Sequence, residues 1–135
     1  IKTVEAFIDE MCTYFVLEDL DHLRKNGRLS AVKALVATAL NIKPVMGATD
    51  QGVIIQLGQA RGMQKALRLM AETITAELEH PEEKVLGLVH CNNPERAEYV
   101  KQELMKLVKV KDIIVLESSG VSTLYAAQGG IIIAV

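Results

Sequence analysis

Residues 84–117 read KVLGLVHCNNPERAEYVKQELMKLVKVKDIIVLE, and this stretch decides the fold class. Two apolar segments, Val85–Val89 and Ile113–Leu116, enclose a segment with helical periodicity. Asn93 suits a helix N-cap and Pro94 suits the first helical position. A continuous apolar run is typical of a strand buried on both faces, and we expect this for residues 85–89. Strand, helix and strand in this order predict a βαβ unit with a right-handed crossover.

The flanking segments alternate between helix and strand patterns in the same way. Helical spacing predicts helices over residues 1–12, 18–25, 30–40 and 62–79. Strands are expected at residues 13–17, 43–46, 52–57, and 129–135. A hairpin turn at Asp50–Gly52 argues against a purely parallel sheet. The expected fold is α/β (α+β), a two-layer sandwich with a mixed β-sheet and helices packed on it, forming one domain over residues 1–135.

Composition narrows the class of protein. Half of the 135 residues are hydrophobic, which excludes a disordered chain, and the net charge of −2 gives no broad surface for nucleic acid. The apolar stretches, such as Ile131–Val135, are far shorter than the roughly 20 residues of a membrane span. Cys12 and Cys91 form no disulfide framework, and the N-terminal residues do not resemble a signal peptide. We therefore expect a cytoplasmic protein with no membrane span.

Residues that carry catalytic or metal chemistry are scattered along the chain. His22, His80 and His90 are far apart, and neither cysteine lies in a Cys-x-x-Cys motif. His90 and Cys91 are adjacent in an expected strand, so their side chains point to opposite faces. We expect no catalytic centre, no metal site and no cofactor, and we interpret His90 as a hydrogen-bonded residue at a strand end.

An acidic cluster of Glu18, Asp19 and Asp21 follows the first expected strand. Such a cluster suits a metal ion or acid–base chemistry. The simpler interpretation is that its charges stabilise the N-terminal turn of the helix that they open.

Two arginines and a hydroxyl-rich segment are candidates for binding an anion. Arg28 lies between a helix end and a helix start, and Arg61 precedes the helix expected from Gly62. Arginine suits bidentate contact with carboxylate or phosphate, although both side chains can equally be solvated. The segment Ser118–Thr123 follows a strand and offers hydroxyl and backbone donors, or else forms an ordinary turn.

An apolar stripe runs through residues 35–46, and its members are Leu35, Ala39, Leu40, Ile42 and Met46. The pattern is typical of a core, and a wall lined against lipid has the same pattern.

Several short stretches occur together in a specific order. They are Phe15–Leu20 with Leu23, Gly27–Ser30, Leu40–Val45, and Arg61-Gly62 followed by Lys65-Ala66. In order and spacing they resemble the C-terminal domain of DegV-family proteins, and the resemblance extends over nearly the whole chain. Asn26 and Met63 depart from the family pattern, which has glycine and arginine there.

The resemblance implies the C-terminal half of a two-domain fatty-acid-binding protein. In that family a long-chain fatty acid lies between the domains, with its tail in an apolar tunnel and its carboxylate held by polar side chains. Bacterial members present the bound acid to a separate fatty acid kinase and are not themselves enzymes. The chain's own N-terminal domain would then be missing from this sequence.

The resemblance also implies roles for individual residues. Arg28 and Arg61 match arginines that face either the head group or the kinase. The family's carboxyl-terminal motif falls on residues 122–129 and makes Ser122, Thr123 and Tyr125 ligand-binding candidates. Tyr125 stands where the family has a histidine expected to touch the carboxylate. The candidate acyl wall consists of Leu35, Leu40, Ile42 and Met46.

Two other functions stay open from the sequence. A regulatory or protein-interaction module with a diverged lipid site is favoured by Tyr125 in place of histidine. An enzyme acting on a phosphorylated metabolite would use Arg28, Arg61 and the hydroxyl-rich segment.

Overall fold

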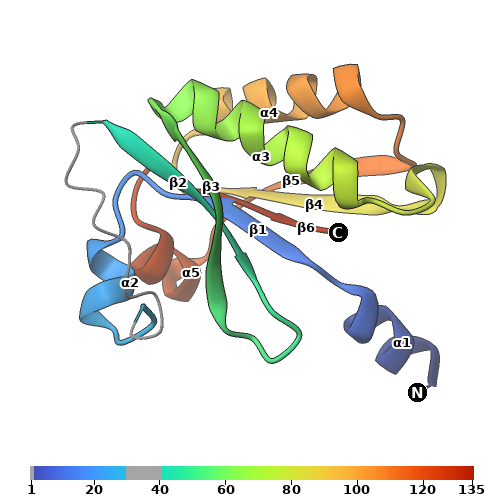
Figure 1. Ribbon diagram of the computed structural model, residues 1–135, viewed down its shortest axis with the longest axis horizontal. Coiled ribbons are helices and arrows are strands. Elements are labelled where there is room, and N and C mark those ends of the chain that lie inside the picture. The colour runs from blue at the N-terminus through green and yellow to red at the C-terminus, as the bar shows by residue number, and fades with distance from the viewer. Residues whose placement is uncertain (1, 30–40) are drawn as a thin grey trace.

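One mixed sheet organises the molecule (Figure 1). The computed structural model describes residues 2–29 and 41–135. Its helices are α1 (Lys2–Glu10), α2 (Asp21–Lys25), α3 (Met63–Glu77), α4 (Pro94–Leu107) and α5 (Gly120–Ala126), with a 3₁₀ turn at Pro81–Glu83. Its strands are β1 (Thr13–Val16), β2 (Ile42–Ala48), β3 (Ile54–Arg61), β4 (Val85–His90), β5 (Asp112–Glu117) and β6 (Ile131–Ala134). The helix expected over residues 30–40 lies outside the described ranges.

The strand order is β3-β2-β1-β6-β4-β5. Strands β4 and β5 pair in parallel with α4 between them in sequence, which confirms the predicted βαβ unit. The other neighbouring strands pair antiparallel, and β2 and β3 form the predicted hairpin. Gly52 in the hairpin turn has φ +75°, a conformation that glycine adopts without steric conflict. The mixed sheet expected from the sequence is therefore confirmed.

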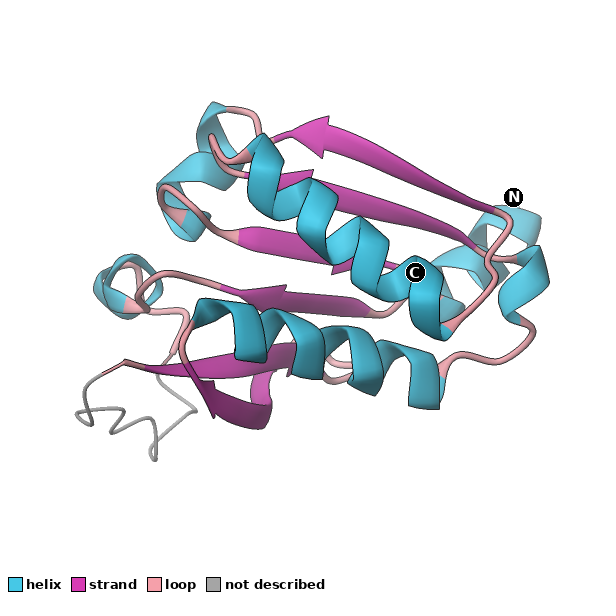
Figure 2. Ribbon diagram, turned by 90° about the horizontal axis from the view of Figure 1, so that it is seen from above, coloured by secondary structure: helices cyan, strands magenta, loops and turns pink. Residues whose placement is uncertain are grey.

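Helices α3 and α4 cover one face of this sheet (Figure 2). The strand side chains that face them are fully buried: Val16, Val45, Leu86, Leu88, Ile131 and Ile133. On α3, Leu67, Met70 and Ile74 close the same core. The two-layer architecture expected from the sequence is confirmed, and this covered face holds the main core.

The expectation that β4 is buried on both faces is wrong. Burial alternates along the strand, and Val85 is 41% exposed whereas Leu86 is fully buried. Both faces of β4 are apolar, so the sequence reads as one continuous run although the helices α3 and α4 cover only one face.

The hydroxyl-rich segment after β5 is a helix rather than a turn. Ser119 has extended backbone geometry just before Gly120, where α5 begins. Ala127 ends the helix with φ +56°, and its N–H donates to the Thr123 carbonyl. The chain then reaches Gly129, whose φ is +84°, before β6 begins.

The short helices lie on the side of the sheet away from α3 and α4 (Figure 1). Helices α2 and α5 pack together at one end, over a small cluster of Leu17, Leu23, Cys91 and Ala126. Helix α1 lies at the opposite end, next to the C-terminus. Among the described residues, none of the helices combines the length and the apolar character needed to cross a membrane.

Candidate functional site

The sheet face opposite α3 and α4 carries large apolar side chains that remain exposed. Val85 is 41% exposed, Ile114 is 47% exposed and Leu116 is 56% exposed. Successive residues of a strand point to opposite faces of the sheet. These exposed side chains therefore alternate along their strands with residues that face α3 and α4. Contiguous exposed apolar surface of this kind marks a binding or docking site.

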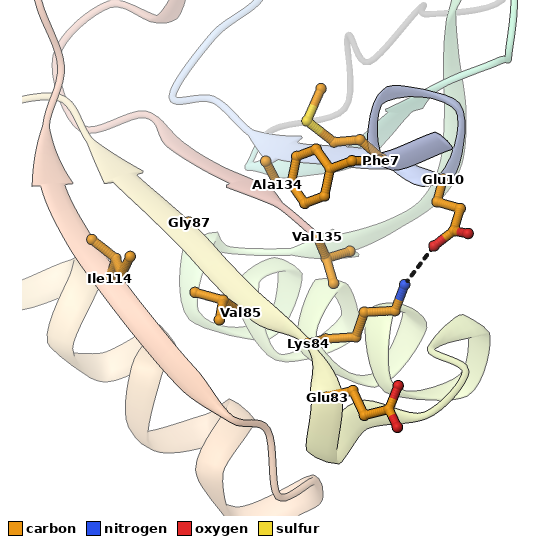
Figure 3. A pocket seen from close by; sticks show the side chains of 10 residues that line it. Phe7, Glu10, Glu83, Lys84, Val85, Gly87, Ile114, Ala134 and Val135 are labelled. Atoms are coloured by element: carbon orange, nitrogen blue, oxygen red, sulfur yellow. Dashed lines mark hydrogen bonds and ion pairs between the residues drawn. The ribbon is translucent and has the colours of Figure 1, made fainter. Parts of the chain in front are cut away.

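A groove of about 480 Å³ hollows this face at the N-terminal end of β4. Its apolar lining comes from α1, β4, the edge strand β5, β6 and the residues that follow α1 and β6: Phe7, Met11, Val85, Gly87, Ile114, Ala134 and Val135. Figure 3 shows the Phe7 ring and Ala134 on one side of Gly87 and Ile114 on the other, with Val85 on the same strand as Gly87. Three charged residues complete the lining, and Lys84 pairs with Glu10 at 3.2 Å.

The other end of the open face is polar and belongs to α5. The Arg28 guanidinium carbon lies 5.9 Å from the centre of the Tyr125 ring, a distance at which a cation and an aromatic ring attract each other. The structure thus brings together two residues that are 97 positions apart. Tyr125 is half-buried, and its ring packs against the small cluster beneath α2 and α5.

The hydroxyl groups of α5 divide between internal bonds and solvent. The Thr123 hydroxyl donates to the Ser119 carbonyl at 2.9 Å and lies 2.7 Å from the Ser118 hydroxyl. Ser122 is exposed on the same helix. Ser122 therefore presents its hydroxyl to a ligand more readily than Thr123 does.

The remaining predicted site residues lie elsewhere. Arg61 is exposed at the end of β3 and pairs across the hairpin with Ile42, the half-buried first residue of β2. Arg61 is the last residue of β3 and, as expected, precedes the helix that begins after Gly62. Met46 is fully buried. Leu35 and Leu40 lie outside the described residues.

An ion-pair network holds the polar end in place. Glu18 pairs with Arg96 at 2.9 Å and with Lys43 at 3.4 Å, and Arg96 also donates to the Gly129 carbonyl. Partial burial raises the pKa of the Glu18 carboxyl, but the two cations outweigh it and the net shift is downward. The network links the residues after β1 to α4 and to the segment between α5 and β6.

The acidic cluster after β1 has structural partners. Asp19 accepts a hydrogen bond from the Asp21 backbone N–H at 3.0 Å, at the first residue of α2. Across residues 2–29 and 41–135, no group of three or more acidic, histidine or cysteine side chains is placed to hold a metal ion. The simpler interpretation of this cluster, stabilisation of a helix start, fits these contacts.

His90 and the cysteines also have structural explanations. His90 is 8% exposed at the end of β4, and its Nδ1 accepts the Asn93 N–H at 3.3 Å. This confirms the interpretation of His90 as a hydrogen-bonded residue at a strand end. Cys12 and Cys91 are both free thiols.

Sequence reasoning missed the groove, because its lining comes from α1, β4, β5 and β6. Two features of the sequence indicate an apolar site of this kind. The first helix has an apolar face that includes Val4, Phe7 and Ile8, and in the structure each of these side chains is more than half exposed. In addition, β4 and β5 have apolar residues on both faces, more than a single helical layer can cover.

The fold and the open face define a class: a two-layer α/β domain that presents an apolar surface leading from a polar end to a groove. The model of the family described as uncharacterised protein, DegV family, matches residues 1–135. The chain belongs to the DegV family.

Relatives and solved structures agree with this assignment. A DegV family protein from Ruminococcus gnavus, in a structure with vaccenic acid, is 49% identical with a TM-score of 0.94, over 99% of this chain and 48% of that one. The fatty acid kinase (Fak) B3 protein of Streptococcus pneumoniae, loaded with linoleic acid, is 26% identical with a TM-score of 0.84, over 98% and 47%. A DegV domain-containing protein of Streptococcus pyogenes is 33% identical over 98% of this chain and 46% of its own length. The chain spans about half the length of these proteins or less.

Proposed function

We propose that residues 1–135 form one lipid-binding domain, which makes one wall of a site for a long-chain fatty acid. The observation that carries this proposal is the open apolar face with a polar end and a groove at its other end. Relatives of about twice this length have been solved with vaccenic and linoleic acids. A second domain of similar size, N-terminal to this one, is the natural cover for the face.

Arg28 and Tyr125 are the proposed carboxylate ligands at the polar end. A guanidinium forms charge-assisted hydrogen bonds with a carboxylate, and these are stronger than neutral ones. The Tyr125 hydroxyl donates a further bond and takes the place of the histidine of the family pattern. Ser122 and Thr123 offer additional hydroxyls on the same helix, with Ser122 the more available.

The acyl chain lies along the exposed side chains of β4 and β5 in this proposal. Burying it releases about 25 cal/mol for each Å² of apolar surface, so affinity rises with chain length. Leu35, Leu40, Ile42 and Met46 remain candidate wall residues. Ile42 keeps exposed surface for this contact, whereas Met46 contributes only if its cover moves.

We further propose that the domain presents the fatty-acid carboxylate to a fatty acid kinase and has no catalysis of its own. The similarity to the fatty acid kinase (Fak) B3 protein supports this partner. Arg61 is exposed near the sheet edge and is a candidate contact for the kinase. A cytoplasmic location is part of this proposal, and the free thiols of Cys12 and Cys91 are in keeping with it.

A second candidate function is a protein-interaction module. The observation that favours it is the exposed apolar face of α1, where Val4, Phe7 and Ile8 have large exposed fractions. In that case the open face binds protein rather than lipid.

The test is organic extraction and mass spectrometry of the intact protein purified from its host, alongside a Tyr125→His variant. Fatty acids bound to the wild type support the proposal and make Tyr125 a working ligand. An empty wild type with a lipid-loaded variant indicates a different natural ligand. If both are empty, the interaction module is favoured.

The variant Arg28→Ala tests whether Arg28 binds the carboxylate specifically or only adds positive charge to the surface. We expect palmitate affinity to fall about tenfold, the loss of a charge-assisted bond. Arg24→Ala is the matched control, since Arg24 is an exposed arginine on α2 that pairs with Asp21. Equal effects of the two variants would remove Arg28 from the site.

A further inference from the structure

The groove is lined at Gly87 by a residue that has no side chain. Across the sheet, Gly87 lies opposite Ile114 on β5 and Ala134 on β6. Two residues further along β4, Val89 occupies the corresponding place on the same face. The face therefore drops at Gly87, between Ile114 and the Phe7 ring (Figure 3).

The backbone does not require glycine at this position. The positive-φ glycines of the described chain are Gly27, Gly52, Gly62 and Gly129, and Gly87 is not among them. A Cβ added at Gly87 has the Ala134 carbonyl oxygen, 4.0 Å away, as its nearest neighbour, which is ordinary contact. The fold accepts a side chain here, so what the glycine provides is space in the groove.

The charges at the two ends of the open face orient a fatty acid. At the groove, Lys84 is paired with Glu10, and Glu83 adds a second carboxylate. These three side chains sum to a negative charge, which disfavours a fatty-acid carboxylate. At the other end Arg28 lies on Tyr125, which favours one. The apolar methyl end is therefore the end that enters the groove.

The length of β4 sets the scale of the ligand. From Val85 to His90 the strand advances five residues, or about 17 Å at about 3.3 Å per residue. An extended chain covers about 1.2 Å per bond, because three backbone bonds span about 3.5 Å. About 14 bonds therefore reach from the groove to the polar end, and the carboxyl group and the terminal methyl add a few more.

We infer that the groove at Gly87 holds the methyl end of an acyl chain of about 16 to 18 carbons, and that Gly87 and Phe7 set the accepted length. This inference rests on the proposed function. Phe7 lines the groove from α1, and the missing side chain at Gly87 leaves space in it.

The experiment measures the affinity of the intact protein for myristate, palmitate, stearate and arachidate. In Gly87→Val the added side chain brings three carbon atoms to the groove, and we expect it to displace about two methylene groups of the ligand. We expect stearate to weaken about tenfold relative to myristate, because each buried methylene contributes a factor of about four. Gly87→Ala gives a smaller shift in the same direction. Ala48→Val adds bulk at an exposed strand position outside the groove lining and should leave the ratio unchanged.

Phe7→Ala tests the same inference in the opposite direction and does not depend on Gly87→Val folding. Removing the ring lengthens the groove, so arachidate should gain relative to palmitate. If the wild type binds fatty acids but both variants keep its length preference, the inference about Gly87 and Phe7 fails and the proposed function stands. If the wild type binds none of the four acids, the proposed function fails and the inference falls with it.

Discussion

The two faces of the sheet are built from the same strands but have different roles. On the face beneath α3 and α4, Leu86 and Leu88 are fully buried, whereas Val85 on the open face of the same strand is 41% exposed. Strand residues alternate between faces, so each strand contributes to both. One sheet face therefore supplies stability, and the other supplies the proposed binding surface, from residues that are neighbours in the sequence.

The largest expected effect is a difference in the free energy of unfolding between variants of the two faces. Leu88→Ala opens a cavity in the covered core, and we expect the free energy of unfolding to fall by about 2 to 5 kcal/mol. The matched change Leu116→Ala, on the open face, should stay within about 0.5 kcal/mol. The chain contains no tryptophan, so urea unfolding is followed by circular dichroism. Equal losses for the two variants would contradict the division of roles.

The reverse comparison uses ligand affinity. Leu116 is 56% exposed on the proposed acyl path, and Leu116→Ala should weaken palmitate binding about tenfold. Leu88→Ala, measured well below its unfolding temperature, should bind palmitate as the wild type does. Titration calorimetry on the intact protein checks both. Unchanged affinity in Leu116→Ala would place the acyl chain elsewhere.

A smaller effect tests the helix layer alone. The Asn93 side chain accepts a hydrogen bond from the Arg96 N–H at the start of α4. Asn93→Ala should lower the free energy of unfolding by about 1 kcal/mol, and Asn93→Ser should preserve most of it because serine also caps helices. Palmitate affinity should not change in either variant. A change in affinity would show that the helix layer and the open face are coupled.

The smallest effect concerns pH. The folded-state pKa of Glu18 lies below its ordinary value of 4.5, so its ion pairs stabilise the protein above that pH. This contribution is lost as the pH falls below about 4.5 and Glu18 becomes protonated. Because the carboxyl is half exposed, we expect Glu18→Gln to cost less than about 1 kcal/mol at pH 7, and the difference to shrink as the pH falls below 4.5. A difference that stays constant over this range would exclude the ion pairs as its source.

Local patterns predicted most of the architecture. The capped helix after Asn93, the hairpin around Gly52 and the parallel pair β4 and β5 each depend on residues close together in sequence. The sequence predicts these elements through backbone geometry and helix capping, and the tertiary contacts of the fold favour the same elements. The segment after β5 was harder, because serine, threonine and glycine favour turns although tertiary packing of Ala126 stabilises a helix.

The candidate site was less predictable for a physical reason. The proximity of Arg28 and Tyr125 depends on the packing of α2 against α5. The spacing of residues in the sequence does not predict this packing. Only the family resemblance predicted that both residues belong to one site. The groove is harder still to predict from the sequence. It depends on the absence of a side chain at Gly87 and on the position of Phe7 in another element. In a continuous apolar run, the presence of a glycine does not by itself predict a groove.

Strand β5 forms one edge of the sheet order, and this has a consequence for handling the protein. The run Ile113–Leu116 is apolar, and it is bounded by the carboxylates of Asp112 and Glu117. An edge strand of this kind is a template for strand addition between molecules, and flanking charges act as gatekeepers against it. Replacing Asp112 and Glu117 by neutral residues should therefore promote aggregation in concentrated solutions.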